Sequence, residues 1–526
     1  MPSTKASSTR KTQPRAKRTK PLANNDASRV TKSVRTKSTG RLQKATTLAR
    51  HKRVLENRDD RPSTIRPTTP PPPTEPRPGV INQVPTEKLA VLVFGTGEAG
   101  ELGLGPKKAA VFSPTLNPLL TNIVQLACGG MHTVALTSDN KIVTWGVNDE
   151  SALGRDTEWD GTMLSIDKDS DDDDEDSDNS KESDDGEEAD MNPLEATPME
   201  IPSDCFPRDT QFSQVAAGDS CSFALTTTGQ VYGWGTFRNS KGETGFRFDE
   251  RGDTVEKQAS PLHIQGLQNI TQICCGDNHA LALDIEGNIW AWGRNEQYQF
   301  GRRLIGRGSK PALIPQKLRV SRNKVKYIAC GGYHCFAIDQ KDNVYGWGAN
   351  SFGEAGYARS AGSNMAFARP TKIRSLCQRQ VLILDGGAHH SAAVTADGDC
   401  LVWGRIDDGQ LGIDFAREHL QNSTQDSMHI RYDDRNRPRI CLRPAVIPTV
   451  QQVAHVACSS DHTIVLDQAG NAYSSGFNSQ GQLGHGSDKD VVVMKRIEGL
   501  TAENGPLTWA GAGGQFSMVA RPTKKY

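Results

Sequence analysis

The chain has 526 residues, and its 62 Lys and Arg residues balance 62 Asp and Glu residues, so the formal net charge is zero. It contains no run of about 18 apolar residues and no apolar signal core at the N-terminus. These absences predict a protein that neither spans a membrane nor is secreted.

The N-terminal segment is strongly basic. Residues 1–53 contain 16 Lys or Arg residues and a single acid, Asp26, and a Pro- and Thr-rich stretch follows at 64–78. We predict that residues 1–85 form a disordered basic tail and linker, because they have too few apolar side chains to build a core. The tail is either a solubilising extension or an arm for polyanions such as DNA, and its one-sided charge favours the arm. Its densest cluster, the candidate nuclear-import signal, contains Arg15, Lys17, Arg18 and Lys20.

Seven copies of one short pattern follow, in which paired Gly residues or their substitutes precede a His and a run of small apolar residues. The copies lie at 129–136, 218–225, 276–283, 331–338, 386–394, 459–466 and 513–520. Residues that tolerate positive φ follow most copies, as in Thr-Thr-Gly at 227–229 and Ala-Asp-Gly at 396–398, and such residues favour tight hairpin turns. A single hairpin cannot bury its faces alone, so the repeats predict stacked units with a shared core.

A second strand that ends in Gly completes each of the first six copies. These strand ends are Trp145-Gly146, Trp234-Gly235, Trp292-Gly293, Trp347-Gly348, Trp403-Gly404 and Ser475-Gly476. The seventh copy has no such follower, and its natural partner is the segment 89–95 near the start of the repeats. Pairing of these two ends removes exposed sheet edges. We therefore predict an all-β fold at 86–526, a seven-bladed β-propeller closed by pairing of N-terminal and C-terminal strands.

An acidic stretch interrupts the loop after Gly154. Residues 167–190 contain 15 acids against Lys168 and Lys181. This composition predicts a disordered acidic insertion at about 160–200. The insertion is either simply solvated, or it competes with DNA for the basic tail or contacts histones.

One repeat departs from the regular spacing. Elsewhere the Gly that ends the second strand is followed by another Gly eight positions later, as in Gly293 and Gly301, whereas Gly235 is followed by Gly245 after ten positions. The longer segment contains Phe237, Arg238 and Asn-Ser-Lys-Gly at 239–242. It predicts either a projecting hairpin that offers an aromatic ring, a cation and a tight turn to a partner, or neutral variation in loop length.

Residues 302–326 form a second basic segment, with nine Lys or Arg residues and no acid. Arginines in a folded loop can bind carboxylates with two hydrogen bonds each. The segment is therefore either a solvated loop or a surface for an anionic partner.

Histidine recurs at one slot in most copies, at His132, His279, His334, His389 and His462. This recurrence predicts structural groups bonded to backbone near the tight Gly residues. Equivalent slots of different blades lie around a ring, so we expect these histidines not to form one metal site, and we expect no cofactor.

Four of the 11 cysteines share another slot, just before the Gly pair. They are Cys128, Cys275, Cys330 and Cys458, and other copies have Ala217 and Ala512 there. Small packing residues explain this pattern better than disulfides or metal ligands, and they predict a reducing compartment.

The Gly-Gly-x-His and Trp-Gly series, with its Leu-Gly followers, resembles the regulator of chromosome condensation family over most of the chain. The segment TFRNSKGETGF at 236–246 is similar to the β-wedge of the branch that exchanges guanine nucleotide on the small GTPase Ran, in a fungal-like form. The resemblance implies an exchange factor without covalent chemistry rather than an enzyme. A Gly-x-Ser-x-Gly motif and a phosphate-binding loop are both missing from the sequence.

The resemblance also implies which residues meet Ran. The wedge would comprise Phe237, Arg238, Asn239, Ser240 and Lys241, and the face around it Asp219, Asp277, Asn278, His389 and His390. The family usually has Asp directly before the His of the third copy, whereas this chain has Asn278 there and Asp277 one place earlier, so the choice between them stays open. The last copy has Phe516 where a His is expected, which puts that contact in doubt.

The segment GRRLIGRG at 301–308 is similar to the loop with which the family engages the acidic patch of histones. The anion-binding residues implied are Arg302, Arg303, Arg307 and Arg322. Together with the basic tail, the resemblance implies a nuclear, chromatin-associated monomer with Ran, histones or the nucleosome, DNA and a nuclear import receptor as partners, and with no membrane contact. It would generate Ran-GTP near chromosomes for nucleocytoplasmic transport and mitosis. The alternative is a non-catalytic chromatin or protein-interaction scaffold, which needs no wedge.

Overall fold

β-Strands supply nearly all regular structure in the residues that the computed structural model describes, which are 79–160, 191–302, 310–363, 366–415, 429–500 and 505–523. The helical segments among them are short: α1 (Pro193–Ala196), η1 (Ser203–Cys205) and η2 (Lys310–Leu313). None of these described helices has the length and apolar character needed to cross a bilayer. The all-β class predicted from the repeats is therefore confirmed.

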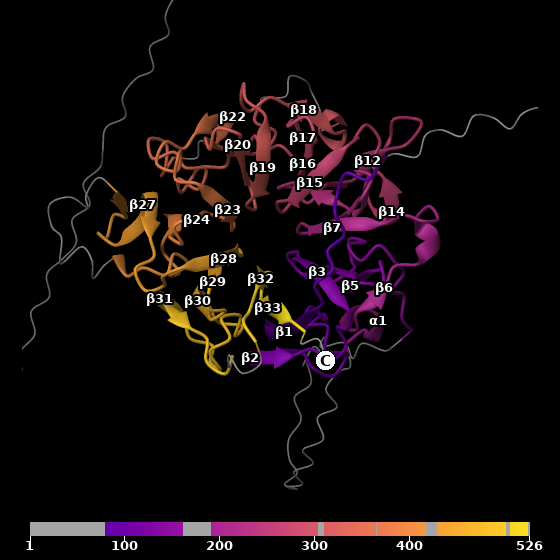
Figure 1. Ribbon diagram of the computed structural model, residues 1–526, viewed down its shortest axis with the longest axis horizontal. Helices are drawn as coiled ribbons and strands as arrows, with labels where there is room; N and C mark the ends of the chain where they lie inside the picture. The colour runs from indigo at the N-terminus through magenta and orange to yellow at the C-terminus, as the bar shows by residue number, and fades with distance from the viewer. Residues whose placement is uncertain are drawn as a thin grey trace, which may run out of the picture. The chain divides into compact units, whose positions relative to one another are not determined.

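Five sheets each follow a continuous stretch of the chain and are arranged around a common centre (Figure 1). Two of them contain β7 (Phe212–Ala217), β8 (Cys221–Thr226), β9 (Val231–Gly235) and β14 (Gln258–His263), and then β15 (Ile270–Cys275), β16 (His279–Asp284), β17 (Ile289–Gly293) and β18 (Gln316–Leu318). The next contains β19 (Val325–Cys330), β20 (His334–Asp339), β21 (Val344–Gly348) and β22 (Phe367–Lys372). The last two contain β23 (Val381–Gly386), β24 (His390–Thr395), β25 (Cys400–Arg405), β27 (Pro438–Val446) and β26 (Ile430–Tyr432), and β28 (Val453–Cys458), β29 (His462–Asp467), β30 (Ala472–Gly476) and β31 (Val491–Arg496).

An eight-stranded sheet joins the two ends of the described chain. Its members are β32 (Trp509–Ala512), β33 (Phe516–Pro522), β1 (Leu89–Thr96), β2 (Ala110–Leu116), β3 (Ile123–Cys128), β4 (His132–Thr137), β5 (Ile142–Gly146) and β6 (Met199–Glu200). β1 pairs with β33 over seven residue pairs, from Leu89 opposite Pro522 to Gly95 opposite Phe516. The predicted pairing of segment 89–95 with the last repeat is thus present.

Each of the first six repeats supplies a hairpin whose turn has the expected backbone. Gly229, Gly287, Gly398 and Gly470 have φ between 79° and 84°, and Asn140 and Asp342 have φ of 65° and 56°. Only Gly and a few polar residues adopt such angles at low cost. The turn residues in the sequence therefore predicted the ends of the paired strands correctly.

The core lies between neighbouring sheets. Five tryptophans from the Trp-Gly motif are almost completely buried, namely Trp145, Trp234, Trp292, Trp347 and Trp403. One cluster, for example, contains Val134 and Leu136 from β4 together with Val215 and Trp234 from the next sheet. Because each Trp buries on the order of 200 Å², a sheet is stabilised mainly by its neighbours.

The repeated histidines also join neighbouring sheets. Nε2 of His132 lies 2.8 Å from Oγ of Ser222, and the same bond links His334 to Ser391, His390 to Thr463 and His462 to Ser517. Each hydroxyl donates onward to a backbone carbonyl, as Ser222 does to Ala152 at 2.8 Å, so the His Nε2–H is the donor to the hydroxyl. Burial lowers the pKa of His132 to about 4, which keeps the ring neutral. The structural role is confirmed, and His132 also bonds to the backbone of Asp219 as expected. The Nε2 partner, however, is a hydroxyl of the next sheet, and in the fifth copy His390 rather than the expected His389 occupies the slot.

Three positions before most of the repeated histidines stands a Gly that leaves no room for a side chain, whereas Ser459 stands there before His462. A Cβ on Gly276 would overlap the His279 ring and the carbonyl oxygen of Gly331 in the next sheet. We expect Gly276→Ala to lower the free energy of unfolding by about 2–3 kcal/mol, as overpacking does in well-packed cores. Urea unfolding would measure this, with Gly79→Ala as the control because its Cβ would meet nothing within 4 Å. Equal unfolding midpoints for the two variants would contradict the packing argument.

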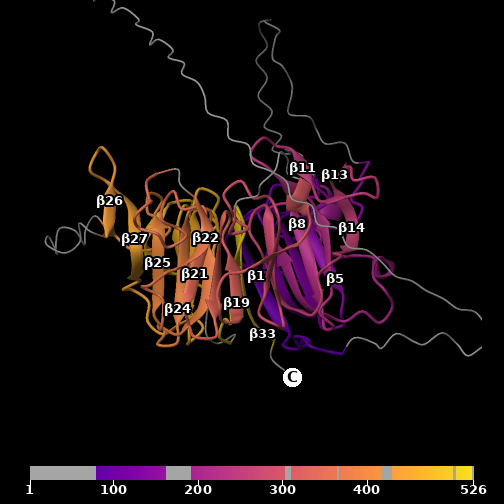
Figure 2. The ribbon, with the colours of Figure 1, turned by 90° about the horizontal axis from the view of Figure 1, so that it is seen from above.

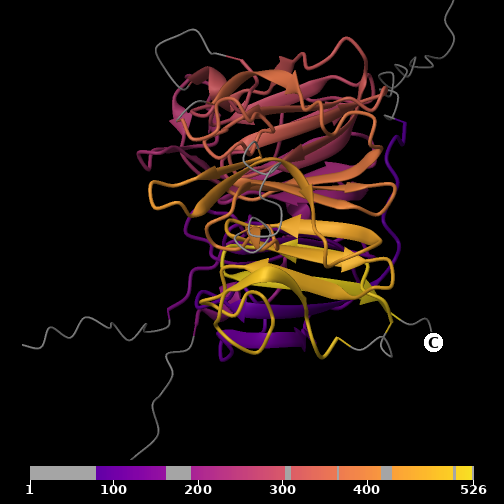
Figure 3. The same ribbon diagram turned by 90° about the vertical axis from the view of Figure 1, so that its left-hand side faces the viewer.

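Two boundaries differ from the prediction. The linker was expected to extend to residue 85, but Ile81 and Asn82 already bond to the sheets: both backbone N–H groups donate to Thr227 O at 2.8 and 3.0 Å. Figure 3 shows the indigo segment that precedes β1 running along one side of the molecule. The acidic insertion was expected to extend to about residue 200, but α1 begins at Pro193 with Asn192 as its cap, and β6 pairs with β5. Hydrogen bonds to the β8–β9 turn hold the first segment, whereas helix capping and strand pairing hold the second.

Candidate functional site

Two short hairpins follow the Gly235 end of β9 and project from one side of the ring of sheets, where β11 and β13 are labelled in Figure 2. The first consists of β10 (Phe237–Arg238) and β11 (Thr244–Gly245), and the second of β12 (Arg247–Phe248) and β13 (Thr254–Val255). The irregular repeat therefore forms a projecting hairpin, as one of the two sequence interpretations required. The name wedge hairpin is used below for 237–245.

The side chain of Phe237 is fully buried. Its ring is stacked against Phe246, with the ring centroids 5.6 Å apart, and also packs against Phe223. The prediction that Phe237 offers its ring to a partner is therefore wrong. The ring sits at the base of the hairpin, where the apolar face of the neighbouring core is available, and it anchors the hairpin instead.

The tip of the wedge hairpin is polar, exposed and held in one conformation. The Oδ1 atom of Asn239 accepts hydrogen bonds from the backbone N–H groups of Lys241 at 3.0 Å and Glu243 at 2.8 Å. The tip residues Ser240, Lys241 and Gly242 are all exposed. Such a turn costs little to present to a partner, because it is already ordered.

The adjacent sheet braces the wedge hairpin from the side. The buried Arg294 guanidinium donates to Phe237 O at 3.0 Å and to Glu243 O at 2.5 Å, so it holds both strands of the hairpin. Glu296 accepts from the backbone N–H and the hydroxyl of Ser240 at 2.9 and 3.0 Å. Asn278 accepts from the backbone N–H of Arg238 at 2.5 Å. Asn278 is thus committed to the hairpin.

Acidic residues lie beside the hairpin at the mouth of a central cavity. Burial raises the pKa of Asp219, while the nearby Arg238 opposes that shift. Burial also raises the pKa of Asp277, whose carboxylate accepts a hydrogen bond from Tyr333. The charge of Asp277, followed by burial, raises the pKa of Tyr333 in turn. Two carboxyl groups and a phenol therefore form one coupled polar cluster.

The two candidate histidines of the fifth copy have different environments. His389 is partly exposed, its ring stacks with Tyr333 at 6.2 Å between centroids, and its Nδ1 lies 3.7 Å from Glu354 Oε1. His390 is completely buried, bonds to Thr463, and has its pKa lowered to about 3 by burial. Its assignment to a partner-facing position is wrong, because it occupies the structural His slot. Phe516 is buried at the same slot of the last copy.

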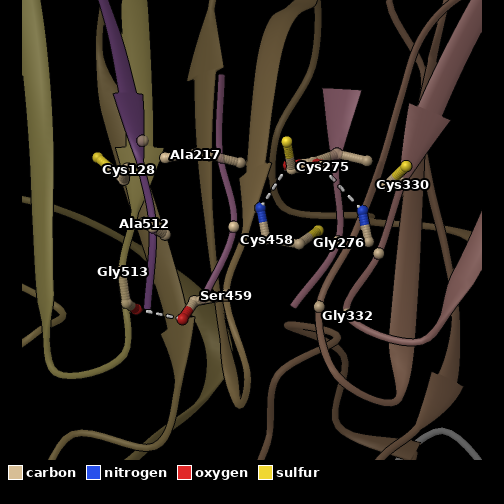
Figure 4. A pocket seen from close by; sticks show the side chains of 18 of the residues that line it. Cys128, Ala217, Cys275, Gly276, Cys330, Gly332, Cys458, Ser459, Ala512 and Gly513 are labelled. Carbon is tan, nitrogen blue, oxygen red and sulfur yellow. Dashed lines mark hydrogen bonds between the residues drawn. The ribbon is translucent and has the colours of Figure 1, made fainter. Parts of the chain in front are cut away.

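The central cavity has a volume of about 410 Å³ and is lined by the first strands of the repeats. Figure 4 shows that its wall includes the slot that precedes the Gly pairs, occupied by Cys128, Ala217, Cys275, Cys330, Cys458 and Ala512. The 11 cysteines are free thiols, and burial raises the pKa of Cys128 to about 12. The interpretation as small wall residues rather than disulfides is therefore confirmed.

His279 approaches two cysteines of the next sheet. Its ligand atom and the Sγ atoms of Cys330 and Cys335 lie within 4.8 Å of one another, a grouping of one histidine with two cysteines that the repeat pattern did not indicate. The Nε2 atom of His279 lies 3.0 Å from Cys335 Sγ, which in turn donates to Gln299 O. This arrangement repeats the His–hydroxyl bond of the other sheets with sulfur in place of oxygen, so we assign it a structural role.

The second basic segment is divided between two ends of a sheet. Arg302 follows the Gly293 end of β17, whereas Arg322 follows β18, whose Leu318 lies opposite Ile289 at the other end. The structure therefore does not bring Arg302 and Arg322 together. Lys317, Arg319, Arg322 and Lys324 line a separate cavity of about 350 Å³ near the β16–β17 turn. Arg303, Arg307, the acidic stretch at 161–190 and the tail residues Arg15, Lys17, Arg18 and Lys20 lie outside the described residues.

Sequence reasoning missed Arg294, Glu296 and Tyr333. Arg294 directly follows the Trp-Gly motif, but a residue after the motif varies between copies, so its position alone gives no signal. The contacts of Arg294 and Glu296 with the wedge hairpin depend on which loop of the next sheet lies beside the hairpin. Only the three-dimensional arrangement supplies that information.

Comparison with known proteins gives a consistent picture. The family model described as RCC1-like domain matches residues 90–519. "Guanine nucleotide exchange factor SRM1" of Saccharomyces cerevisiae is 35% identical over 82% of this chain and 87% of its own length, and "Protein pim1" of Schizosaccharomyces pombe is 32% identical over 84% and 76%. The solved structure of yeast RCC1 (Prp20) bound to Kap60 has a TM-score of 0.72 at 32% identity, covering 84% of this chain and 90% of that one. The structure of Prp20p from Saccharomyces cerevisiae, described with its binding properties to Gsp1p and histones, has a TM-score of 0.71 at 32% identity and covers 85% and 94%.

Proposed function

The chain belongs to the RCC1-like domain family, and from that premise we propose that it is the guanine nucleotide exchange factor for the small GTPase Ran. The main support for this proposal is the wedge hairpin, which is exposed at its tip and fixed at its base. In addition, the chain is similar over most of its length to a protein named as an exchange factor. The activity requires no covalent step and no cofactor.

The wedge hairpin would act by negative coupling. Its tip, Asn239 to Glu243, presses against the nucleotide-binding region of Ran, so that hairpin and nucleotide each lower the affinity of the GTPase for the other. The coupling is reciprocal, and therefore the hairpin speeds release of GDP and GTP alike. The cellular excess of GTP over GDP sets the direction of exchange. A tip already ordered by Asn239 and Glu296 loses little entropy on contact.

Ran would rest on the mouth of the central cavity beside the hairpin. Asp219, Asp277 and His389 are the residues we assign to this contact, together with Tyr333, which bonds Asp277 and stacks with His389. We favour Asp277 over Asn278 as the contact residue, because the amide of Asn278 already binds the hairpin backbone. Arg238, Ser240 and Lys241 would supply the polar contacts of the hairpin.

We further propose that the sheets constitute a closed seven-bladed propeller that begins near residue 81, with a basic tail before it and an acidic insertion beginning near 160. The eight-stranded sheet would count as two blades, β32-β33-β1-β2 and β3-β4-β5-β6, joined through a single residue pair, Leu89 and Ile123. Among the described residues no other strand pairing connects the two halves, which supports that division. Each blade would then have the four-stranded form of its neighbours.

Chromatin binding would use the opposite end of the sheets. Ile81 and Asn82, close to the first described residue, bond to the β8–β9 turn. Arg319 to Lys324 lie near the β16–β17 turn. Both turns are at the strand ends remote from Gly235 and Gly293. The tail would bind DNA and a nuclear import receptor, and Arg322 with its neighbours would bind histones. A monomer in the nucleus could thus hold chromatin and Ran together, placing Ran-GTP production at chromosomes.

The decisive experiment measures release of fluorescent GDP from Ran in the presence of excess GTP. We expect the purified protein to speed release by several orders of magnitude and to leave an unrelated small GTPase such as Ras unaffected. Unchanged kinetics with Ran would reject the exchange function in favour of a non-catalytic chromatin scaffold.

A further inference from the structure

A second projecting hairpin, outside the repeat pattern, interrupts the sheet of β23 to β27. β26 pairs only with β27, and the turn between them is Asp433–Arg437. The additional strand β26 gives this sheet five strands, whereas the other sheets that follow a continuous stretch of the chain have four. The name second arm is used below for residues 429–441.

The second arm projects from the same side as the wedge hairpin. Arg405, at the end of β25, lies opposite Ile440, and β27 continues past it to Pro438 and the turn. Gly404 of β25 occupies the same repeat position as Gly235 of β9, because each Gly pairs with the first residue of the strand before it. The wedge hairpin begins after Gly235. Figure 2 shows β26 and β11 rising on the same side of the molecule, and Figure 1 places β27 and β14 on opposite sides of its centre. A partner seated over the central cavity lies between the two.

The tips of the two hairpins have the same construction. Oδ1 of Asp433 accepts from the backbone N–H groups of Arg435 and Arg437 at 2.9 and 2.8 Å, as Asn239 does in the wedge hairpin. Asn436 has a φ of 58° at the position of Gly242. The base is fixed too, because Arg431 donates to Ala361 O in the loop between β21 and β22, and because Ile440 and Cys441 are buried. The second arm is therefore an ordered projection.

The second arm carries a surplus of positive charge. Arg431, Arg435, Arg437 and Arg439 are all exposed, against the acids Asp433 and Asp434. Asp433 is paired with Arg437 at 2.8 Å, but the Arg437 side chain remains 68% exposed, so all four arginines stay accessible to a partner. Arginine binds carboxylates with directional hydrogen bonds, which suits an acidic protein surface.

The arm is also connected to the mouth of the cavity. The Arg439 guanidinium lies 5.4 Å from the centroid of the Phe352 ring, and the same ring lies 4.9 Å from that of His389. His389 in turn stacks with Tyr333, the partner of Asp277. A continuous surface of side chains therefore joins the second arm to the site assigned to Ran.

We propose that the second arm binds the same GTPase as the wedge hairpin, through Arg435, Arg437 and Arg439 and an acidic surface of the GTPase remote from its nucleotide. The proposal rests on the proposed exchange function. The arm adds affinity and speeds encounter, whereas the wedge hairpin displaces the nucleotide.

The test is steady-state GDP release from Ran by the full chain carrying Arg435→Glu and Arg437→Glu. At about 50 mM salt we expect KM for Ran-GDP to rise about tenfold while kcat changes less than about twofold, and the difference to shrink at about 300 mM salt, because screening weakens exposed charge pairs. The matched control, Arg374→Glu with Arg379→Glu, makes the same charge change at exposed residues before β23, at the other end of the sheet, and should keep the wild-type KM.

A second variant guards against local misfolding. Replacing Asp433–Arg437 by Asn-Gly retains a hairpin turn between Tyr432 and Pro438 and should raise KM to the same extent. If both arm variants keep the KM of the control, the proposal is overturned while the exchange function stands. If the wild-type protein itself does not release GDP from Ran, both the exchange function and the arm are rejected.

Discussion

Replacing the five tip residues Asn239–Glu243 of the wedge hairpin by a two-residue Asn-Gly turn is expected to abolish GDP release from Ran while leaving the fold intact. The tip is exposed and packs on no core cluster, so its removal should leave the thermal unfolding temperature nearly unchanged. In the proposed mechanism exchange depends on contact between this tip and the nucleotide-binding region of Ran, so we expect kcat to fall by several orders of magnitude. Stopped-flow release of fluorescent GDP, with circular dichroism melting of the same sample, measures both quantities.

The β12–β13 hairpin offers a matched control for that experiment. Its turn, Asp249–Asp253, is built in the same way, with Asp249 Oδ1 accepting from the N–H groups of Arg251 and Asp253 at 3.0 and 2.8 Å. Shortening this turn to Asn-Gly should preserve exchange. Equal loss of activity in the two variants, or full activity without the 239–243 tip, would show that the wedge hairpin has no special role.

Phe237→Ala, unlike the tip variant, is expected to lower the stability of the fold strongly. The ring is fully buried among Phe223, Phe246 and Trp292, and truncation of buried Phe typically costs about 3–5 kcal/mol. Urea unfolding should show this decrease, and Phe237→Leu, which retains most of the volume, should lose less than about 2 kcal/mol. If the two substitutions have equal and negligible effects, the ring does not anchor the hairpin.

These two experiments separate the parts of the wedge hairpin that the sequence treats as one segment. The tip variant tests contact with Ran, and the Phe237 variants test attachment to the core. Because Arg294 bonds to the backbone of Phe237 and Glu243, the attachment also sets the position of the tip. A purified Phe237→Leu protein that remains folded should therefore retain measurable exchange.

The sequence predicted the sheets well because the repeat signals are local. The turn residues, the Trp-Gly ends and the His slot each act within a few residues, and seven repetitions reinforce one another. The pairing of segment 89–95 with the last repeat followed from counting strands. The second arm was not predicted, because a single hairpin at 430–446 has no repeated counterpart to identify it.

The sequence was less informative about which side chains face a partner. Phe237 and Arg238 are neighbours, yet successive strand residues point in opposite directions, so one is buried and the other exposed. The adjacent His389 and His390 differ because β24 begins at His390, whereas His389 lies in the bend before it. Arg302 and Arg322 lie in one basic segment, but the intervening strand carries them to opposite ends of a sheet. Such assignments require the register, which a motif alone does not supply.

The pairing of β1 with β33 has a consequence for synthesis of the protein. β1 leaves the ribosome more than 400 residues before its partner Phe516–Pro522, so during translation its edge has no final neighbour and is open to mispairing with other nascent chains. A nonsense codon just upstream of residue 516 would leave that edge permanently uncovered, although nearly all of the polypeptide had been made. Messages truncated so late should yield aggregated or degraded product rather than a partly active one.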